Sequence, residues 1–134
     1  MTESVQIGVL DTSVVIDLDH LTAATLPNIA TVPSVVLAEL GAGIHAATDP
    51  IERAHRVDRL QRVSLQFESL PFDEAASQQY ALLVAHVIAA GRNPRPRRFD
   101  LLIGATAASN QLPLYTRNPK DFEGLENALT VIPV

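Results

Sequence analysis

The 134-residue chain contains no cysteine and no apolar run long enough to cross a bilayer. Without cysteine it can form no disulfide, no thiolate metal site and no cysteine nucleophile, and it suits a reducing cytoplasm, where we expect the protein. Residues 1–4 lack the basic segment and apolar core of a secretory signal. The histidines show no metal-ligand spacing, and a glycine-rich phosphate loop is missing. We therefore expect neither thiol chemistry nor a membrane partner.

What remains is typical of one folded domain. Hydrophobic residues make up 47% of the chain and charged residues 19%, which suits a single core and argues against disorder. We expect residues 1–134 to form a single domain without internal repeats or linkers. The net charge of −5 argues by itself against a nucleic-acid binder. The local charge is positive directly before Asp100, because four of the ten basic residues lie in the segment 92–98.

Short apolar runs rich in β-branched residues alternate along the chain with segments of helical spacing. N-cap residues precede several of these segments, notably Asp49 and Asp73, and Gly91 suits a helix C-terminus. Strands joined by helices imply right-handed crossovers, so we predict an α/β fold whose mainly parallel sheet of about five strands is covered on both faces. The predicted strands are 5–10, 29–32, 67–70, 112–116 and 129–134. The predicted helices are 14–18, 34–44, 51–65, 74–90 and 99–108, with a short turn or helix at 118–122. The helix over 99–108 is apolar nearly all round and should be well buried.

Four acidic residues stand where the chain otherwise turns apolar, small or strand-like: Asp11, Glu39, Asp100 and Asp121. Asp11 and Asp121 follow predicted strands, and sites in parallel sheets form at the carboxyl ends of strands. Asp100 falls in the first turn of its helix, where the helix dipole favours a carboxylate. Glu39 lies about one and a half turns into its helix and could reach back toward the same end. Because an uncompensated acid beside a buried element is costly, we predict that the four share one site.

A shared site of this kind suits a hard divalent cation. Several like charges in a small site raise one another's pKa values, and a cation removes that repulsion. Oxygen ligands in a chain without cysteine favour Mg²⁺, or Mn²⁺, over zinc. Such an ion can activate water and stabilise the charge that develops at a phosphodiester. The pattern therefore points to metal-assisted phosphodiester chemistry.

Each acid also has an ordinary structural interpretation. Asp11 could be only a helix N-cap, and Asp100 only a first-turn acid that stabilises its helix. Glu39 could lie on the solvent side of its helix. Asp121 belongs to an Asn-Pro-Lys-Asp segment, which is typical of turns. The order of the four acids along the chain favours the shared site over these separate interpretations.

Four segments resemble PIN-domain ribonucleases, and more closely the VapC toxins of bacterial toxin–antitoxin pairs. They occur in the family's order and span essentially the whole chain. Together they match the acids, the small residues beside them and the closing Thr-x-Asn-x-x-Asp-Phe pattern. The segments are 9–13, 36–40, 98–107 and 115–122.

The resemblance implies a three-layer α/β/α PIN fold and a Mg²⁺- or Mn²⁺-dependent endoribonuclease that cleaves structured RNA, such as tRNA or rRNA loops, to inhibit translation and growth. It also implies a homodimer and inhibition by a cognate VapB-type antitoxin. By position, Asp11, Glu39 and Asp100 are the core metal-binding and catalytic acids, and Asp121 is the fourth. Family members differ in whether the position of Asn118 or that of Asp121 faces the metal. The supporting residues would be Thr12, Ser13, Thr116 and Asn118.

The basic residues near the acids have two interpretations. The 92–98 loop is either a solvated, proline-stiffened connector or a rim that contacts RNA phosphates. Carboxylates of an antitoxin could use the same arginines. We expect contact with RNA or antitoxin at Arg92, Arg95, Arg97, Arg98 and Arg117. A second set recurs every third residue, a spacing that drifts around a helix, and we interpret it as a solvated helix surface; it comprises Arg53, Arg56, Arg59 and Arg62.

Three rival functions stay open at this point. The first is a PIN-fold RNA-processing nuclease without an antitoxin. The second is a non-enzymatic module that binds metal and acts only within a complex. The third is a phosphoryl-transfer enzyme for small phosphate esters, which the missing phosphate loop disfavours.

Overall fold

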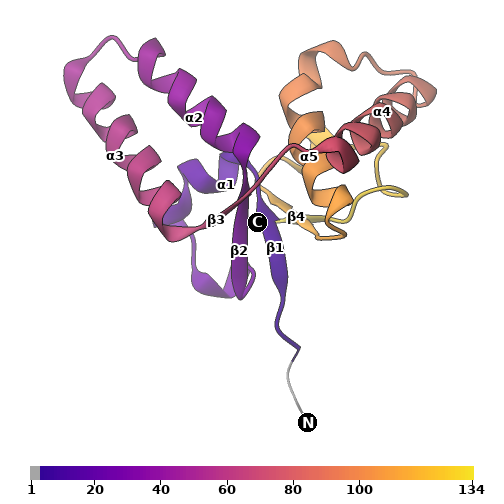
Figure 1. Ribbon diagram of the computed structural model, residues 1–134, viewed down its shortest axis with the longest axis horizontal. Coiled ribbons are helices and arrows are strands. Elements are labelled where there is room, and N and C mark those ends of the chain that lie inside the picture. The colour runs from indigo at the N-terminus through magenta and orange to yellow at the C-terminus, as the bar shows by residue number, and fades with distance from the viewer. Residues whose placement is uncertain (1–3) are drawn as a thin grey trace.

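The computed structural model describes residues 4–134, and at its centre is a five-stranded sheet whose neighbouring strands are all parallel (Figure 1). Residues 1–3 lie outside the described residues, as do the parts of the secretory-signal and single-domain predictions that concern them. The strand order is β3-β2-β1-β4-β5. The strands are β1 (Ile7–Leu10), β2 (Ile29–Pro33), β3 (Glu68–Leu70), β4 (Leu114–Thr116) and β5 (Val131–Pro133).

The central strand β1 pairs with two strands that lie far apart in the sequence. On one side β1 pairs with β2, and on the other Val9 is in register with Leu114 of β4. In chain order, β2 and β3 are added on one side of β1, and β4 and β5 are then added on its other side. The direction therefore reverses between β1 and β4, which makes their carboxyl ends the place where an open α/β sheet forms a ligand site.

Helices cover both faces of the sheet and complete a three-layer α/β/α fold (Figure 1). The helices α1, α2 and α3 lie on one side and α4 and α5 on the other, as right-handed crossovers require when the strand order reverses. Within these layers α2 packs on α3 and α4 packs on α5. The α-helices are α1 (Thr12–Ile16), α2 (Ser34–Ala46), α3 (Pro50–Gln66), α4 (Glu74–Ala89) and α5 (Arg98–Ser109). The 3-10 helices are η1 (Leu18–His20), η2 (Ala23–Thr25), η3 (Arg95–Arg97) and η4 (Pro119–Phe122).

Local sequence signals set several of these helix ends. The Asp49 carboxylate accepts the backbone N–H of Glu52 at 3.1 Å, and the Asp73 carboxylate accepts that of Ala76 at 2.9 Å. Each such N-cap contributes about 1 kcal/mol. After α4 the backbone turns into the left-handed region at Gly91, with φ of 75°. The N–H of Arg92 then reaches back to the carbonyl of Val87 at 3.0 Å, which closes a Schellman motif.

Close packing locks β1 to β4. The Tyr115 ring of β4 lies directly over Gly8 of β1, so a Cβ at residue 8 would collide with it. The Tyr115 side chain is only 4% exposed, and its hydroxyl donates to the Gln6 side-chain oxygen at 3.4 Å. Glycine at position 8 therefore permits the close approach that fixes the two strands beside the site.

Each predicted strand and helix is present, but several ends differ. The strands β1, β4 and β5 begin two residues later than predicted, and α1 begins at Thr12 rather than at residue 14. The helix over 99–108 is well buried, as predicted, except at its first turn, where Phe99 is 57% exposed. Among residues 4–134 no helix has the length and hydrophobicity needed to span a bilayer.

Candidate functional site

Asp11 lies at the carboxyl end of β1, at the point where the strand order reverses. Its side chain is buried and accepts two hydrogen bonds at one oxygen, from the Ser13 hydroxyl at 2.6 Å and from the Val14 backbone N–H at 3.1 Å. The N-cap interpretation of Asp11 is therefore confirmed. It does not compete with a second role, because the other carboxylate oxygen accepts no hydrogen bond from the described residues.

Glu39 is held by a hydroxyl from another helix. The Thr12 side chain of α1 donates to one Glu39 carboxylate oxygen at 2.7 Å, which ties α2 to the turn that follows β1. Glu39 is half-buried, so full exposure on the solvent side of α2 is not its position. Thr12 and Ser13, both predicted as supporting hydroxyls, thus each orient one of the four acids.

The pKa of Asp100 responds to the charges of the other three acids. It lies in the first turn of α5 and is half-buried. Burial, followed by the negative charges of Asp121, Asp11 and Glu39, raises the pKa of Asp100 from 3.8 to about 6. Arg97 opposes this rise in the pKa. The structure therefore brings Asp11, Glu39 and Asp121 within electrostatic range of Asp100.

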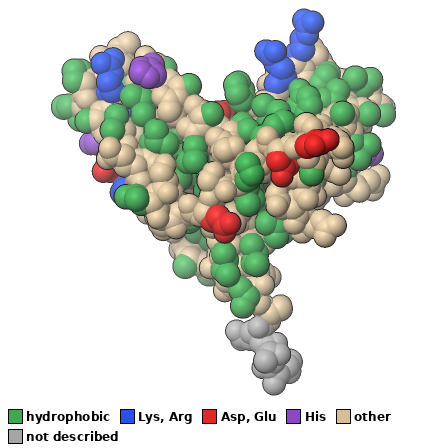
Figure 2. All heavy atoms as spheres, in the orientation of Figure 1, with side chains coloured by type: hydrophobic (Ala, Val, Ile, Leu, Met, Phe, Trp, Pro, Cys, Tyr) green, Lys and Arg blue, Asp and Glu red, His purple; other side chains and the backbone are tan. Residues whose placement is uncertain are grey.

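Two lobes of helices diverge above the sheet: α2 and α3 form one, and α4 and α5 form the other (Figure 1). α2 and α5, which carry Glu39 and Asp100, contact one another where the lobes diverge above the sheet (Figure 1). In the space-filling view an acidic side chain is visible in the notch between the lobes, and basic side chains stand above the start of α5 (Figure 2).

Asp121 is placed by backbone contacts of the turn that contains it. It lies in η4, and Arg97 donates to the Asp121 backbone carbonyl at 2.7 Å. The backbone N–H of Asp121 binds the carbonyl of Asn118 at 3.0 Å. Sequence inspection treated Arg97 only as an external contact and missed this role, for which the sequence contains no local signal.

The other two predicted supporting residues, Thr116 and Asn118, bind each other at the start of the turn that leads to η4. The buried Thr116 hydroxyl accepts the backbone N–H of Asn118 at 3.0 Å, and it makes no hydrogen bond to an acid. The Asn118 side chain is exposed and has no hydrogen bond with another described residue. Asp121, by contrast, acts on the pKa of Asp100. Which of the two residues faces a metal stays a prediction.

The predicted arginine contacts divide into two groups. Arg92 pairs with Glu123 at 2.6 Å, Arg117 pairs with Asp17 at 3.4 Å, and Arg97 binds the η4 carbonyls. Arg95 and Arg98 are exposed, and their side chains have no partner among residues 4–134. Contact with RNA or antitoxin stays a prediction for all five, but only Arg95 and Arg98 are free of internal contacts.

Two members of the second arginine set, interpreted as a solvated surface, also bind a neighbouring helix end; Arg53 is exposed as expected, and Arg56 is half-buried. Arg53 donates to the carbonyl of Ala47 at 2.8 Å, and Arg56 donates to that of Gly43 at 2.6 Å. Both arginines satisfy carbonyls at the C-terminal end of α2, which a helix leaves without intrahelical partners. The spacing of three residues placed them on α3 correctly but did not reveal the neighbouring helix end.

The donor chemistry of the cluster fits a hard divalent cation, although the carboxylates are not arranged around one. Within residues 4–134 no group of three or more Asp, Glu, His or Cys side chains is positioned to hold a metal ion. The cluster nevertheless offers oxygen ligands only, and its like charges raise the pKa of Asp100. A bound cation would relieve that repulsion, so Asp11, Glu39, Asp100 and Asp121 are the residues that could hold it.

Comparison with known proteins gives one family for nearly the whole chain. The model of the PIN domain matches residues 8–126. Ribonuclease VapC5 of Mycobacterium tuberculosis is 40% identical over 127 residues, which cover 92% of this chain and 91% of the relative. Ribonuclease VapC of Rickettsia bellii is 30% identical and covers 86% and 87% of the two chains.

Solved structures agree with this assignment. A chain of the toxin–antitoxin system VapBC-5 from Mycobacterium tuberculosis matches with a TM-score of 0.84 and 39% identity, covering 96% of this chain and 98% of that one. VapBC2 from Rickettsia felis, bound to a DNA fragment from its promoter, matches with a TM-score of 0.79 at 22% identity, over 96% and 99% of the chains. The second likeness concerns the fold alone.

Proposed function

The chain belongs to the PIN-domain family and, within it, to the VapC ribonucleases, and we propose that it is a metal-dependent endoribonuclease acting as the toxin of a type II toxin–antitoxin pair. The observation that carries this proposal is the convergence of three carboxylates, those of Asp11, Glu39 and Asp121, on Asp100 at the β1–β4 switch point. Sites for phosphodiester cleavage need concentrated negative charge that a hard cation can neutralise. A structural acid would not be placed beside three others.

In the proposed mechanism Asp11, Glu39, Asp100 and Asp121 would hold Mg²⁺, or Mn²⁺, which would supply Lewis-acid chemistry at the scissile phosphate. The Thr12 and Ser13 hydroxyls keep Glu39 and Asp11 in place. Arg97 fixes the η4 backbone and adds positive charge beside Asp100. These contacts set the geometry of the carboxylates before an RNA strand arrives.

We further propose that the substrate is structured RNA, with tRNA or rRNA loops as the class to test first, and that the protein works in the cytoplasm. Loops expose unstacked bases and backbone together, which is where RNA is most often recognised. Similarity to a chain of a toxin–antitoxin system supports a VapB-type antitoxin as partner. A homodimer is part of the same proposal.

The test is cleavage of total bacterial RNA by the purified chain with Mg²⁺, with Mn²⁺ and with EDTA. We expect discrete fragments in both metals and none in EDTA. Asp100→Asn should lower the rate by at least about 100-fold, because losing a partner of a metal ligand already costs roughly 10–100-fold. Asp73→Asn is the matched control, since asparagine caps a helix as well as aspartate and residue 73 caps α4 away from the cluster.

The opposite outcomes are equally clear. A folded chain that leaves every RNA intact in all conditions would contradict the nuclease and favour the binding module. Undiminished cleavage by Asp100→Asn would contradict the assignment of the site. Expression in a bacterial host separates toxin from processing enzyme, because growth arrest that Asp11→Ala abolishes is expected only of a toxin.

A further inference from the structure

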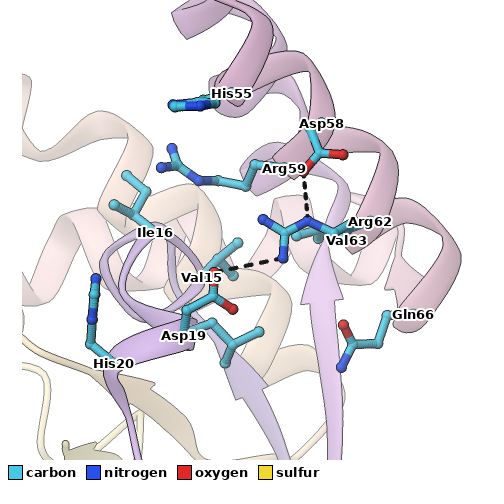
Figure 3. Close-up of a pocket in the computed structure, with 11 residues that line it drawn as sticks. Val15, Ile16, Asp19, His20, His55, Asp58, Arg59, Arg62, Val63 and Gln66 are labelled. Atoms are coloured by element: carbon cyan, nitrogen blue, oxygen red, sulfur yellow. Dashed lines mark hydrogen bonds and ion pairs between the residues drawn. The ribbon is translucent and has the colours of Figure 1, made fainter. Parts of the chain in front are cut away.

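A polar pocket lies beside the acid cluster, between α3 and the 3-10 helix η1, and none of the residues that the sequence singled out as site residues lines it. Its volume is about 440 Å³, within the roughly 300–1,000 Å³ of typical ligand sites. Figure 3 shows its side chains, which come from α3 on one side and from α1 and η1 on the other. The polar residues that line it are Asp19, His20, His55, Asp58, Arg59, Arg62 and Gln66.

Arg59 is the available cation of this pocket. Arg62 is held by two acids, at 2.9 Å from Asp58 and 3.6 Å from Asp19. Arg59 has no hydrogen bond or ion pair with any residue in 4–134. In Figure 3 its side chain extends from α3 toward Ile16, with His55 on one side and His20 on the other. Arg59 is therefore the arginine of this pocket that makes no ion pair within residues 4–134.

The pocket adjoins a cleft that reaches one acid of the cluster. This second cleft has a volume of about 330 Å³ and is lined by Thr12 and Glu39, the hydrogen-bonded pair of the cluster. Ile16 and Arg59 line both spaces. We call the two adjoining spaces the groove; it extends from Glu39 past Ile16 and Arg59 to the pocket that His20 and His55 line.

We propose that this groove binds the single-stranded RNA that leads away from the scissile phosphate, with Arg59 contacting a backbone phosphate and the pocket between His20 and His55 receiving the adjoining nucleotide. The proposal rests on the proposed ribonuclease function. An arginine in a pocket that two imidazole rings also line offers both the phosphate contact and the stacking surfaces that single strands use. The polar lining and its direct connection to Glu39 favour a nucleic-acid strand over an apolar protein segment.

The experiment measures binding without cleavage, in the Asp100→Asn background, by fluorescence anisotropy of a labelled single-stranded RNA of mixed sequence across a range of salt concentrations. Arg59→Gln should weaken binding several-fold and reduce the slope of log affinity against log salt by about 0.7, the value for one phosphate contact on a single strand. The double variant His20→Gln/His55→Gln should weaken binding at pH 8 with an unchanged slope, because neutral imidazoles contribute stacking and no charge.

Arg53→Gln is the matched control, because it removes the same charge from the same helix. Arg53 binds the carbonyl of Ala47 and does not line the groove, so its loss should leave the salt slope unchanged. Thermal melting of each variant verifies that it is folded. Arg59→Gln should melt like its parent, since Arg59 has no partner among the described residues.

Equal affinity and salt slope in Arg59→Gln and Arg53→Gln, with cleavage by the wild-type chain intact, would overturn the groove and leave the ribonuclease standing. If the wild-type chain cleaves no RNA, the ribonuclease function itself fails. A labelled oligoglutamate peptide tests the competing occupant. Tighter binding of that peptide than of RNA, lost in Arg59→Gln, would overturn the proposal in favour of an acidic protein segment.

Discussion

The acid cluster has two sides that are held in different ways. Asp11 and Glu39 each accept a short hydrogen bond from a hydroxyl, at 2.6 and 2.7 Å. The side chains of Asp100 and Asp121 accept no hydrogen bond from residues 4–134, and Arg97 acts on them through a backbone carbonyl and through its charge. One side is therefore oriented before any ligand binds, while the other keeps its carboxylate oxygens free. The difference shows that carboxylates can be brought near one another without all of them being held in place by hydrogen bonds.

Among variants that change how the two sides of the cluster are held, Thr12→Val should lower cleavage the most. It removes the hydroxyl that orients Glu39 but keeps the side-chain shape. We expect cleavage to fall by roughly 10–100-fold, the usual cost of losing a residue that orients a metal ligand. Single-turnover cleavage with Mg²⁺ measures it. Thr12→Ser should restore most of the rate, because serine retains the donor.

Thr25→Val is the control for that variant. The Thr25 hydroxyl donates only to the Thr22 carbonyl, on an exposed part of the molecule. Its loss should leave cleavage within about twofold, as surface substitutions usually do. Equal rates in Thr12→Val and in the wild-type chain would show that Glu39 needs no orientation, and the two sides of the cluster would then be equivalent.

Arg97→Gln should have a smaller effect, on the other side of the cluster. It removes a charge-assisted hydrogen bond of 2.7 Å to the Asp121 carbonyl and the positive charge that opposes the rise in the pKa of Asp100. We expect a loss of cleavage of about tenfold or less, since such bonds contribute roughly 1.5–3 kcal/mol and only part of this acts on the reaction. In EDTA the pKa of Asp100, followed by carbon NMR, should rise further above about 6.

Arg95→Gln controls for removing a charge from the same segment. Arg95 is exposed and does not contribute to the shift at Asp100, so the pKa of Asp100 should stay unchanged in that variant. The same pKa in the Arg97 and Arg95 variants would contradict the electrostatic role of Arg97.

The smallest effect concerns stability without metal. The pKa of Asp100 is raised from 3.8 in the unfolded chain to about 6 in the folded one, so the folded state binds the proton more tightly. Protonation of Asp100 therefore stabilises the folded state; this contribution is complete below pH 4 and is lost as the pH rises through 6. The shift alone corresponds to roughly 3 kcal/mol, and solvent screening of a half-buried group reduces it to about 1–2 kcal/mol.

Urea unfolding in EDTA between pH 4 and 7 measures this contribution. Asp100→Asn should remove it, so the variant should lose less stability than the wild-type chain as the pH rises. Parallel curves for the two proteins would mean that the repulsion at Asp100 is absent from the folded chain.

Much of the fold could be predicted from the sequence because its signals are local. Asp49 before Pro50, Asp73 and Gly91 each act within a few residues, and the structure uses all three as helix ends. A shared site for the acids was predicted because Asp11 and Asp121 follow strands and because sites in parallel sheets form at the carboxyl ends of strands. Family resemblance then fixed which acids to consider.

The parts that could not be predicted depend on contacts between distant segments. Arg97 reaches a carbonyl 24 positions away in the turn at Asp121, and Arg56 reaches Gly43 on the preceding helix. Hydrophobic periodicity says nothing about which carbonyls a neighbouring helix end or turn leaves free. The exposure of Phe99 has the same origin, because an apolar position is buried only when another element covers it.

The pairing of β1 with β4 has a consequence for synthesis. β1 is made well before β4, since Val9 pairs beside Leu114, more than 100 residues later in the chain. Contacts between such distant segments form late, because a long loop must be ordered first. A nascent chain that has not yet reached β4 therefore lacks the strand that brings η4 and Asp121 to the other acids, and its acid cluster is incomplete.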